Sequence, residues 1–271
     1  MLTRLGVLGW PVAHSRSPAM HNAALQELGL APAWRYQLLP VPPELLAETV
    51  RALPAAGFRG TNVTIPHKEA ALALADTASA RARAIGAANT LVFEPDGAFA
   101  ADNTDAPGLI AALPEPPAGR TALVLGAGGS ARAAAWALRD AGAADVAVWN
   151  RTPQRARALA ADLGVRAVEQ AHPADLLVNC TAVGLGGSGI TALKDLPVRA
   201  DALCEYTCVV DLVYRDGGTP LLAAAARQGC AVVDGLEVLV RQGALSLEAF
   251  AGRPAPVAVM RAAAGAQRSP S

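Results

Sequence analysis

Short apolar runs alternate along the chain with longer stretches in which apolar residues recur every three or four positions. The runs are typical of buried strands, and the recurring stretches are typical of helices with one apolar face. In the first part of the chain we predict strands at residues 5–8, 34–38, 60–65, 89–93 and 98–101, and helices at 17–28, 43–53, 67–77 and 107–113. This alternation predicts an α/β domain, residues 1–113, with a largely parallel sheet.

The alternation resumes after a proline-rich run at residues 114–119, a composition typical of a linker between domains. Strands are predicted at 122–125, 145–149, 176–180, 209–212 and 231–233, and helices after residue 130, at 153–163 and at 220–228. We therefore expect a second α/β domain, residues 114–235. The helical stretch that follows has an apolar stripe, so we expect residues 236–271 to pack back on the first domain, which would leave a cleft between two lobes.

The first strand of the second domain runs directly into a glycine-rich turn that opens an alanine-rich helix, Gly126-Ala127-Gly128-Gly129-Ser130-Ala131. This is the GxGxxA pattern of dinucleotide-binding Rossmann domains. Gly126 permits a tight turn, Gly128 lets the backbone approach a pyrophosphate, and Ala131 lets the helix lie close to the strand. The phosphates would lie at the helix N-terminus, where free N–H groups favour anions. Such turns also occur without a ligand, so the pattern needs support from other residues.

The next strand ends at Asn150-Arg151-Thr152, about where an acidic residue would bind the ribose of NAD. Arg151 occupies this place, and Arg155 and Arg157 follow it. A cation here favours the 2′-phosphate of NADP. The alternative is a solvated helix face, which we expect of Arg157 rather than of Arg151.

Composition narrows the class of protein further. The 271 residues carry 23 basic and 23 acidic side chains, so nothing indicates a nucleic-acid or anionic-membrane partner. No uncharged stretch resembles a membrane span and no signal region precedes the first strand, so we expect a soluble cytoplasmic protein. Four cysteines do not predict a disulfide framework in a chain of this length, and Cys204 and Cys208 lack companions at metal-binding spacing, so we expect no metal site.

Polar residues gather where the predicted strands of the first domain end or begin, and open parallel sheets bind their ligands at such an edge. The groups are His14-Ser15-Arg16-Ser17, Pro66-His67-Lys68, Asn89-Thr90 and Asp102-Asn103-Thr104-Asp105. Each also has a structural explanation. Ser17 and Asp105 are suited to capping helices, and Lys68 is suited to a solvated first turn.

Taken together, these groups form part of a larger ordered pattern. The blocks HSRSP, GTNVTIPHK, GAANT, DNTD, GAGGSAR, NRT, DLVY and DGLEVLVRQGALSLE follow one another along the chain. In content and order they resemble the shikimate dehydrogenase family over nearly the whole sequence, from residue 5 to about residue 252. The resemblance implies an N-terminal α/β substrate domain, a Rossmann-type NADP-binding domain and a C-terminal helix that returns to the first domain.

The resemblance also implies an activity and a substrate site. The activity is the reversible NADPH-linked reduction of 3-dehydroshikimate to shikimate, in chorismate and aromatic amino-acid biosynthesis. Ser15 and Ser17 resemble the hydroxyls that bind the shikimate carboxylate. Other positions resemble residues that hold this carboxylate or the ring hydroxyls, namely Thr64, Asn89, Gln242 and, beside the carboxylate, Tyr214. Lys68 and Asp105 resemble the pair that brackets the reacting hydroxyl.

On the cofactor side, three groups of positions match the family. Gly126, Ala127, Gly128, Gly129 and Ser130 match the pyrophosphate loop. Asn150, Arg151, Thr152 and Arg155 match the residues that hold the adenosine phosphate. Thr181, Leu212 and Gly235 match positions that line the nicotinamide.

The residue types suit the reduction of a ring ketone, because negative charge develops on the carbonyl oxygen. Lys68 would either give up a proton to that oxygen or stabilise the alkoxide. Asp105 beside it would keep the amine charged and oriented, whereas burial would favour the neutral amine. The residues leave open which effect dominates.

The chain departs from the family pattern at several places. Ala182 stands where a serine is usual, and Glu237 replaces a glycine on the nicotinamide side. Ala80 lies near where some relatives supply an acidic contact to the cofactor, so we expect that contact to be missing here.

Two alternative functions stay open. One is a quinate/shikimate dehydrogenase that works oxidatively, which Asn150-Arg151-Thr152 disfavours because such relatives often use NAD. The other is a non-catalytic NADP-binding regulator of the same fold, which should lack Lys68 or Asp105. The sequence allows either a monomer or a homodimer.

Overall fold

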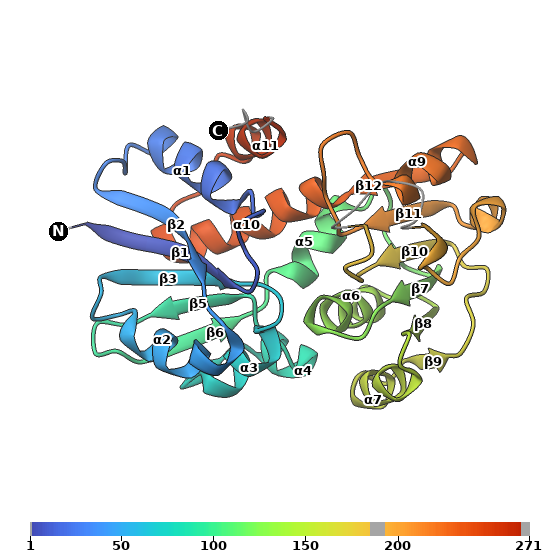
Figure 1. Ribbon diagram of the computed structural model, residues 1–271, viewed down its shortest axis with the longest axis horizontal. Coiled ribbons are helices and arrows are strands. Elements are labelled where there is room, and N and C mark those ends of the chain that lie inside the picture. The colour runs from blue at the N-terminus through green and yellow to red at the C-terminus, as the bar shows by residue number, and fades with distance from the viewer. Residues whose placement is uncertain (1, 185–192, 267–271) are drawn as a thin grey trace. The chain divides into compact units, whose positions relative to one another are not determined.

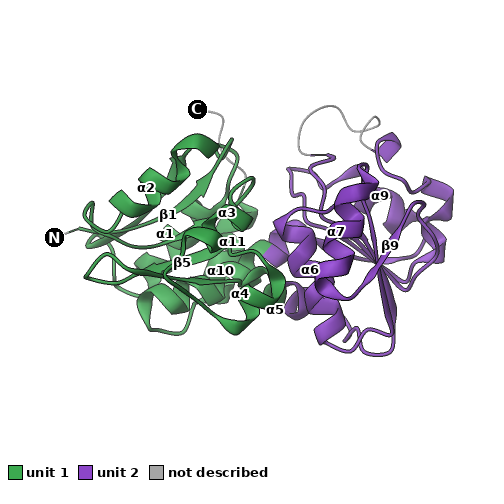
Figure 2. Cartoon of the chain, turned by 90° about the horizontal axis from the view of Figure 1, so that it is seen from below, with its two compact units in different colours: residues 1–108, 239–271 green, residues 109–238 purple. Residues whose placement is uncertain are grey.

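The structure of the protein is a computed structural model that describes residues 2–184 and 193–266 (Figure 1). The chain divides into two compact units, residues 1–108 with 239–271 and residues 109–238 (Figure 2). Each unit has its own sheet and its own hydrophobic core. Residues 267–271, which belong to the predicted C-terminal segment, lie outside the described residues.

Both divisions between the units fall inside helices, α5 (Asp105–Ala112) and α10 (Gly235–Ala251). The sequence pattern predicts them at 113/114 and 235/236. The observed boundaries differ from the predicted ones because Leu109 of α5 and Val238 of α10 are buried in the core of the second unit. The proline-rich run at 114–119 therefore lies inside that unit and is not its boundary.

The first unit is built on a six-stranded mixed sheet in the order β2-β1-β3-β5-β6-β4. Its strands are β1 (Thr3–Gly9), β2 (Trp34–Pro40), β3 (Phe58–Val63), β4 (Thr77–Ala78), β5 (Thr90–Phe93) and β6 (Phe99–Asp102). Strand β1 runs parallel to β2 and β3, whereas β5 runs antiparallel to β3 and β6. The parallel part is the one whose carboxyl edge carries the predicted serines and Thr64.

Helices cover this sheet because their apolar residues recur on one side. They are α1 (Ser17–Glu27), α2 (Leu46–Ala52), α3 (Lys68–Leu74), α4 (Ala80–Ile85) and α11 (Val257–Gly265), with the 3₁₀ turn η1 (Pro43–Leu45). Leu46 and Val50, one turn apart on α2, pack with Ala71 of α3 against Leu8 and Leu91 of the sheet. Helix α11 packs against α1, where Arg16 donates a hydrogen bond to the Ala264 carbonyl at 2.6 Å.

The second unit has a six-stranded sheet in the order β12-β11-β10-β7-β8-β9, with every pair parallel. Its strands are β7 (Thr121–Leu125), β8 (Asp145–Trp149), β9 (Arg166–Val168), β10 (Leu176–Asn179), β11 (Cys208–Asp211) and β12 (Ala231–Asp234). Numbered within the unit, this is the 3-2-1-4-5-6 order of the Rossmann fold.

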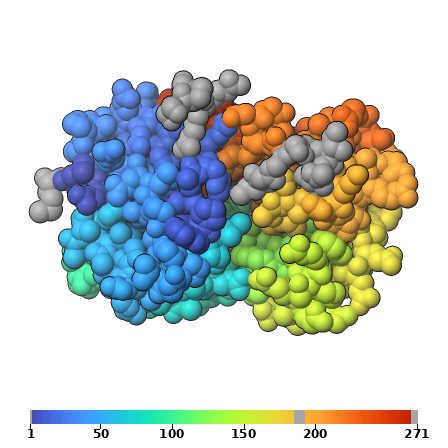
Figure 3. All heavy atoms as spheres, in the orientation of Figure 1, coloured from blue at the N-terminus to red at the C-terminus, as the bar shows by residue number. Residues whose placement is uncertain are grey.

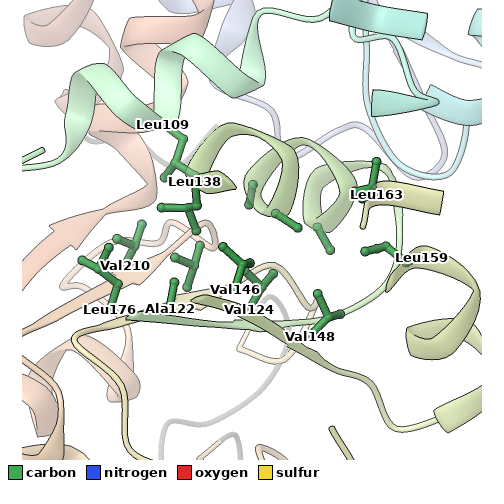
Figure 4. Close-up of a cluster of buried hydrophobic side chains, with 14 of the residues drawn as sticks. Leu109, Ala122, Val124, Leu138, Val146, Val148, Leu159, Leu163, Leu176 and Val210 are labelled. Carbon is green, nitrogen blue, oxygen red and sulfur yellow. The ribbon is translucent and has the colours of Figure 1, made fainter. Parts of the chain in front are cut away.

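Helices lie on both faces of this sheet, and successive apolar residues of each strand pack against one face and then the other. The helical elements are α6 (Gly129–Asp140), α7 (Pro153–Leu163), α9 (Pro220–Arg227) and the 3₁₀ segment η2 (Ala200–Glu205). Val124 packs with Leu138 and Leu159 in the cluster of Figure 4, whereas Leu123 packs on the opposite face with Leu221 of α9. Residues next to each other on a strand point to opposite faces, so an uninterrupted apolar run is required here.

The predicted α/β fold class is confirmed, but the region after Lys68 is divided differently from the prediction. The sequence pattern predicts one helix at 67–77, whereas the chain forms α3, β4 and α4. Ser79 starts α4, because its hydroxyl accepts a hydrogen bond from the Ala82 N–H at 3.0 Å and donates one to Asp102 at 2.5 Å. No glycine or proline marks this break in the sequence. The short elements β9 and η2 were also not predicted.

Candidate active site

Lys68 and Asp105 form a largely buried ion pair in the first unit. Each is the first residue of its helix, α3 and α5, and Lys68 Nζ lies 2.6 Å from Asp105 Oδ2. The Lys68 side chain is 9% exposed and that of Asp105 is 18% exposed. The burial of Lys68 shows that it is not a solvated first-turn residue. Asp105 does not cap α5, because Asn103 Oδ1 accepts the Ala106 N–H at the start of this helix. The pair is therefore held in place with its functional groups facing each other.

Asn89 orients the other oxygen of the Asp105 carboxylate. This fully enclosed residue, 2% exposed, precedes β5, and its Nδ2 lies 2.8 Å from Asp105 Oδ1 and 3.0 Å from Gln242 Oε1. Its own side-chain carbonyl oxygen accepts the Thr104 N–H at 2.7 Å. The structure thus brings four predicted residues, Lys68, Asp105, Asn89 and Gln242, into one hydrogen-bonded cluster, which we call the lysine cluster.

Polar residues that the sequence analysis did not single out extend the lysine cluster into the core. Asn62 on β3 donates to Thr90 at 3.3 Å and to the Asn89 backbone carbonyl at 3.2 Å. Its oxygen accepts from the Tyr36 hydroxyl at 2.9 Å and from Ser246 at 3.2 Å. Asn62 stands in the GTNVTIPHK block, but only the structure shows that its amide is buried and therefore needs partners.

Ser15, Ser17 and Thr64 lie at the carboxyl edge of the parallel strands β1 and β3. The Thr64 N–H donates to the Leu8 carbonyl at 2.8 Å, and the Ser17 N–H donates to Ser15 Oγ at 3.3 Å. Both serines are buried, and Ser17 does not cap α1, whose N-cap is Arg16 without a side-chain bond. The capping interpretation of Ser17 is therefore wrong. Two hydroxyls beside a helix N-terminus suit a carboxylate ligand.

The glycine turn of the second unit has the geometry that a pyrophosphate requires. Gly126 has a φ of +115°, and a side chain there would lie 3.2 Å from the Cys180 backbone. Gly128 is the N-cap of α6, has no side-chain cap, and has open space where a side chain would stand. Ala131 is fully buried against the strand. Main-chain N–H groups at this helix start can therefore receive phosphate oxygens, so the residues fit a dinucleotide.

The cations that follow β8 divide into two kinds. Arg157 forms an ion pair with Glu169 at 2.5 Å, as expected of a solvated helix face. Arg151 and Arg155 are exposed, and neither forms an ion pair within the described part of the chain. The segment near residues 150–160 lies at the surface (yellow-green in Figure 3). Asn150 stabilises the turn by donating to the Thr152 carbonyl at 3.0 Å. Because Arg151 and Arg155 are exposed and form no ion pair among the described residues, their guanidinium groups are available to a phosphate.

Strands β10, β11 and β12, which lie on the other side of β7 from β8, each end at a residue whose side chain accepts a backbone N–H. Each final side chain accepts the N–H two residues on: Asn179 that of Thr181 (3.1 Å), Asp211 that of Val213 (3.1 Å) and Asp234 that of Leu236 (2.9 Å). Asn179 pairs in register with Asp211, and Asp211 with Asp234.

The positions predicted to line the nicotinamide, Thr181, Leu212 and Gly235, lie within two residues after these three strand ends. A dinucleotide on a Rossmann sheet spreads its two halves to either side of the glycine turn. Arg151 lies on the β8 side of this turn, and the three positions predicted to line the nicotinamide lie on the β10–β12 side. A side chain at Gly235 would lie 2.5 Å from the Leu212 carbonyl oxygen, so these turns also contact each other.

Other predicted positions are located by the structure without their roles being tested. Tyr214 lies in the second unit, in the loop after β11, and Glu237 lies in the first turn of α10. Ala182 follows Thr181, and Ala80 is the first residue of α4. The approach of Tyr214 to the substrate, the hydroxyl lost at Ala182, the carboxylate of Glu237 on the nicotinamide side and the cofactor contact missing at Ala80 stay predictions.

Comparison with known proteins identifies the family. Residues 7–91 match the shikimate dehydrogenase substrate binding domain, residues 113–183 match shikimate / quinate 5-dehydrogenase, and residues 235–264 match the shikimate 5'-dehydrogenase C-terminal domain. The shikimate dehydrogenase (NADP(+)) of Methylobacterium radiotolerans is 49% identical over 92% of this chain and 91% of its own length. The chain belongs to the shikimate dehydrogenase family.

Further members of this family support the assignment at the level of structure. The shikimate dehydrogenase (NADP(+)) of Paracoccus denitrificans is 45% identical over 92% of this chain and 90% of its own. The crystal structure of shikimate 5-dehydrogenase from Thermus thermophilus, in complex with NADP(H) and shikimate, is 46% identical. It has a TM-score of 0.87 and covers 97% of this chain and 98% of its own. A 5-ketofructose reductase from Gluconobacter, 32% identical with a TM-score of 0.83, shares the fold. Within the described residues, no helix is long and apolar enough to span a membrane.

Proposed function

We propose that this protein is an NADP-dependent shikimate dehydrogenase that reduces 3-dehydroshikimate to shikimate, reversibly. The observation that carries the proposal is the buried Lys68–Asp105 pair, 2.6 Å apart, within the hydrogen-bonded lysine cluster. Family membership supplies the substrate, since the Thermus thermophilus relative is described in complex with NADP(H) and shikimate. The proposed enzyme is cytoplasmic, is a monomer or homodimer, and binds no nucleic acid.

NADPH, when bound, supplies the hydride for this reduction. The task of the chain is to handle the charge that develops on the ketone oxygen. Lys68 Nζ is its proton donor and electrostatic partner, and such general acid help is worth about 10² to 10⁴ in rate. Asp105 holds the ammonium in one direction, and Asn89 holds Asp105 through its second oxygen.

Composition makes Lys68 stand out among the basic residues. Of 23 lysines and arginines, only Lys68 and Lys194 are lysines. A guanidinium stays protonated in proteins, whereas an ammonium can release its proton. In a chain that otherwise uses arginine almost throughout, the buried position next to Asp105 has a lysine, which of these two residue types is the one that can act as an acid.

The substrate side of the proposal uses the hydroxyls and amides of the first unit. Ser15, Ser17 and Thr64 bind the carboxylate or ring hydroxyls at the sheet edge, with Asn89 and Gln242 contributing from the lysine cluster. Tyr214 of the second unit completes the carboxylate contacts.

The cofactor side of the proposal uses the second unit. The glycine turn and Ser130 receive the pyrophosphate, Asn150, Arg151, Thr152 and Arg155 hold the adenosine phosphate, and Thr181, Leu212 and Gly235 line the nicotinamide. The exposed and unneutralised Arg151 favours NADP over NAD.

Two other functions are disfavoured by specific observations. A regulator that had lost the reaction would have no reason to keep an ion pair buried at a ligand-binding edge, because burying charges costs free energy. Oxidation of quinate with NAD conflicts with Arg151. Quinate carries one hydroxyl more than shikimate, and a pocket rejects such an addition only modestly, so we expect weak activity with quinate and NADP.

The test is a spectrophotometric assay of the purified protein with each substrate and cofactor. We expect rapid NADPH oxidation with 3-dehydroshikimate, slower oxidation of NADH, and only slow NADP reduction with quinate. Equal efficiency with NADH would overturn the cofactor assignment. Absence of turnover with 3-dehydroshikimate, in protein that binds NADP by calorimetry, would overturn the activity.

A further inference from the structure

The carboxylate of Asp211 ties together two of the three strand ends of the second unit. Asn179 Nδ2 donates to Asp211 Oδ1 at 2.9 Å, and the Thr219 hydroxyl donates to Oδ2 at 2.7 Å. The same Asn179 side chain accepts both the N–H and the hydroxyl of Thr181, at 3.1 and 2.7 Å. The turn after β10 is therefore joined to the turn after β11 through two side chains.

Leu212 is held from both directions by this arrangement. Its N–H donates to the Asn179 carbonyl at 3.0 Å, and the next N–H, that of Val213, donates to Asp211. Its carbonyl lies against Gly235, where no side chain would fit. Thr181 and Leu212 thus have little freedom to move independently of Asp211.

We propose that Asp211 is a positioning residue for the nicotinamide. Its buried carboxylate fixes Thr181 and Leu212 in one relative arrangement, and it does so through Asn179 and the Val213 N–H. This inference rests on the proposed function, which assigns Thr181, Leu212 and Gly235 to the nicotinamide.

The surroundings of Asp211 argue against a purely stabilising role. The residue is 1% exposed, and no cation forms an ion pair with it among residues 2–184 and 193–266. Strand β10 and the turn before α9 face it with neutral donors, and β12 faces it with another acid, Asp234. Burial raises the pKa of the carboxyl to about 6. A buried charge with only neutral donors costs stability, so the benefit of this residue must come from what it holds.

An amide would not replace the carboxylate. Oδ1 receives two donors and Oδ2 receives the Thr219 hydroxyl, whose oxygen already accepts the Leu222 N–H. An asparagine would set its NH₂ group either against the two donors at Oδ1 or against the Thr219 hydroxyl, which would then have to turn its hydrogen away from residue 211. Asp211→Asn therefore preserves shape and breaks one side of the arrangement.

The same sheet offers a matched control at its opposite edge. Asp175 precedes β10, and its Oδ2 accepts the N–H and hydroxyl of Thr121 at 2.7 and 2.9 Å. It is an aspartate with a similar set of donors, and it lies at the end of β10 away from Thr181. Asp175→Asn should disturb the sheet without reaching the nicotinamide residues.

The experiment compares Asp211→Asn with Asp175→Asn. Calorimetry gives the dissociation constant for NADP, and steady-state assays give kcat and KM separately. We expect Asp211→Asn to weaken NADP binding and lower kcat, each by about tenfold, because small misplacements at a reacting centre are costly. We expect Asp175→Asn to stay within about twofold of the wild type in both and to lower the melting temperature.

The pH dependence of NADP binding supplies a readout that lost stability alone would not change. Below about pH 6 the wild-type Asp211 takes up a proton and can no longer accept from every donor. The 2′-phosphate of NADP titrates in the same range, so the difference between the two variants is the informative quantity. We expect Asp175→Asn to follow the wild type and Asp211→Asn to lose part of the dependence.

A second pair of variants decides the question if Asp211→Asn does not fold. Thr219→Ser keeps the hydroxyl that donates to Asp211, and Thr219→Val removes it. We expect Thr219→Ser to bind NADP like the wild type and Thr219→Val to bind more weakly. Equal binding by both variants, or equal kinetics of Asp211→Asn and Asp175→Asn, would overturn the positioning role. NADP binding without turnover in the wild type would instead count against the proposed function.

Discussion

Asp105 and Asp211 are aspartates that adjoin the sheets of their two units, and they differ in what surrounds them. Asp105 faces an ammonium at 2.6 Å and an amide that holds its second oxygen. Asp211 is surrounded by neutral donors and by another acid, and its pKa is raised to about 6 by burial. The comparison indicates two uses of one residue type. We propose that Asp105 presents a cation to a ligand, whereas Asp211 holds backbone in place.

The largest expected effect comes from removing the Lys68 ammonium, the cation beside Asp105. Lys68→Ala should lower kcat for 3-dehydroshikimate by about 10² to 10⁴ while leaving NADP binding unchanged. Lys194→Ala, which removes the other lysine, is the control and should retain full activity. A large change in NADP affinity in Lys68→Ala would contradict the division of roles between the two regions.

The next effect tests whether Asp105 acts by orienting Lys68. Asp105→Asn should lower kcat by about 10², because the ammonium loses its partner and its fixed direction. Glu69→Gln, an exposed carboxylate beside Lys68 on α3, should be silent. Steady-state assays of the two variants make the comparison, and equal rates would show that Asp105 does not orient Lys68.

A smaller effect is expected from the adenosine-phosphate side. Arg151→Ser should weaken NADPH binding by about tenfold and leave NADH binding unchanged, because one charge-assisted contact to the 2′-phosphate is lost. Arg157→Ser removes a guanidinium already paired with Glu169 and should change neither. Fluorescence titration with both cofactors measures the difference, and an equal loss for NADH would show that Arg151 does not recognise the phosphate.

The smallest effect concerns the contribution of Asp211 to the stability of the second unit. The Asp211 pKa rises from 3.8 to about 6 on folding, so between these pH values the folded state binds the extra proton. Relative to Asp211→Asn, wild-type stability should therefore increase as the pH falls, by about 1.4 kcal/mol for each unit below 6. Denaturant unfolding at pH 7 and pH 5 tests this sign. A wild type that loses stability relative to Asp211→Asn on acidification would refute it.

Asp175 should behave in the opposite way when the unfolding measurement is extended below about pH 4. Hydrogen bonds from the Thr121 backbone and side chain lower its pKa below 3.8. Its stabilising contribution is therefore present above that value and is lost as the pH falls through the lower folded pKa.

The sequence was sufficient for the fold class and for the residues of the lysine cluster that belong to recognisable blocks. Lys68, Asp105 and Asn89 stand in GTNVTIPHK, DNTD and GAANT, and the structure brings them together. The glycine turn was equally clear, because a tight turn with positive φ and an uncapped helix start requires glycine at fixed spacing. These features are local, so the sequence displays them.

Features that depend on distant partners were not predicted. Asp211 ends an apolar strand and resembles an ordinary strand boundary until Asn179 and Thr219 are seen beside it. The break after α3 depends on the contact of Ser79 with Asp102, 23 residues away. The unit boundaries depend on which core encloses Leu109 and Val238. Each of these is decided by tertiary contacts that no periodicity encodes.

The most direct test of the account is chemical rescue of Lys68→Ala by small alkylammonium ions. NADPH oxidation with 3-dehydroshikimate is measured as the amine concentration rises, with Lys194→Ala as the control. We expect Lys68→Ala to be slow and its rate to increase and saturate with added amine, because the amine replaces the missing ammonium beside Asp105. We expect no response in Lys194→Ala. A Lys68→Ala variant that oxidises NADPH as fast as Lys194→Ala without any amine would contradict it.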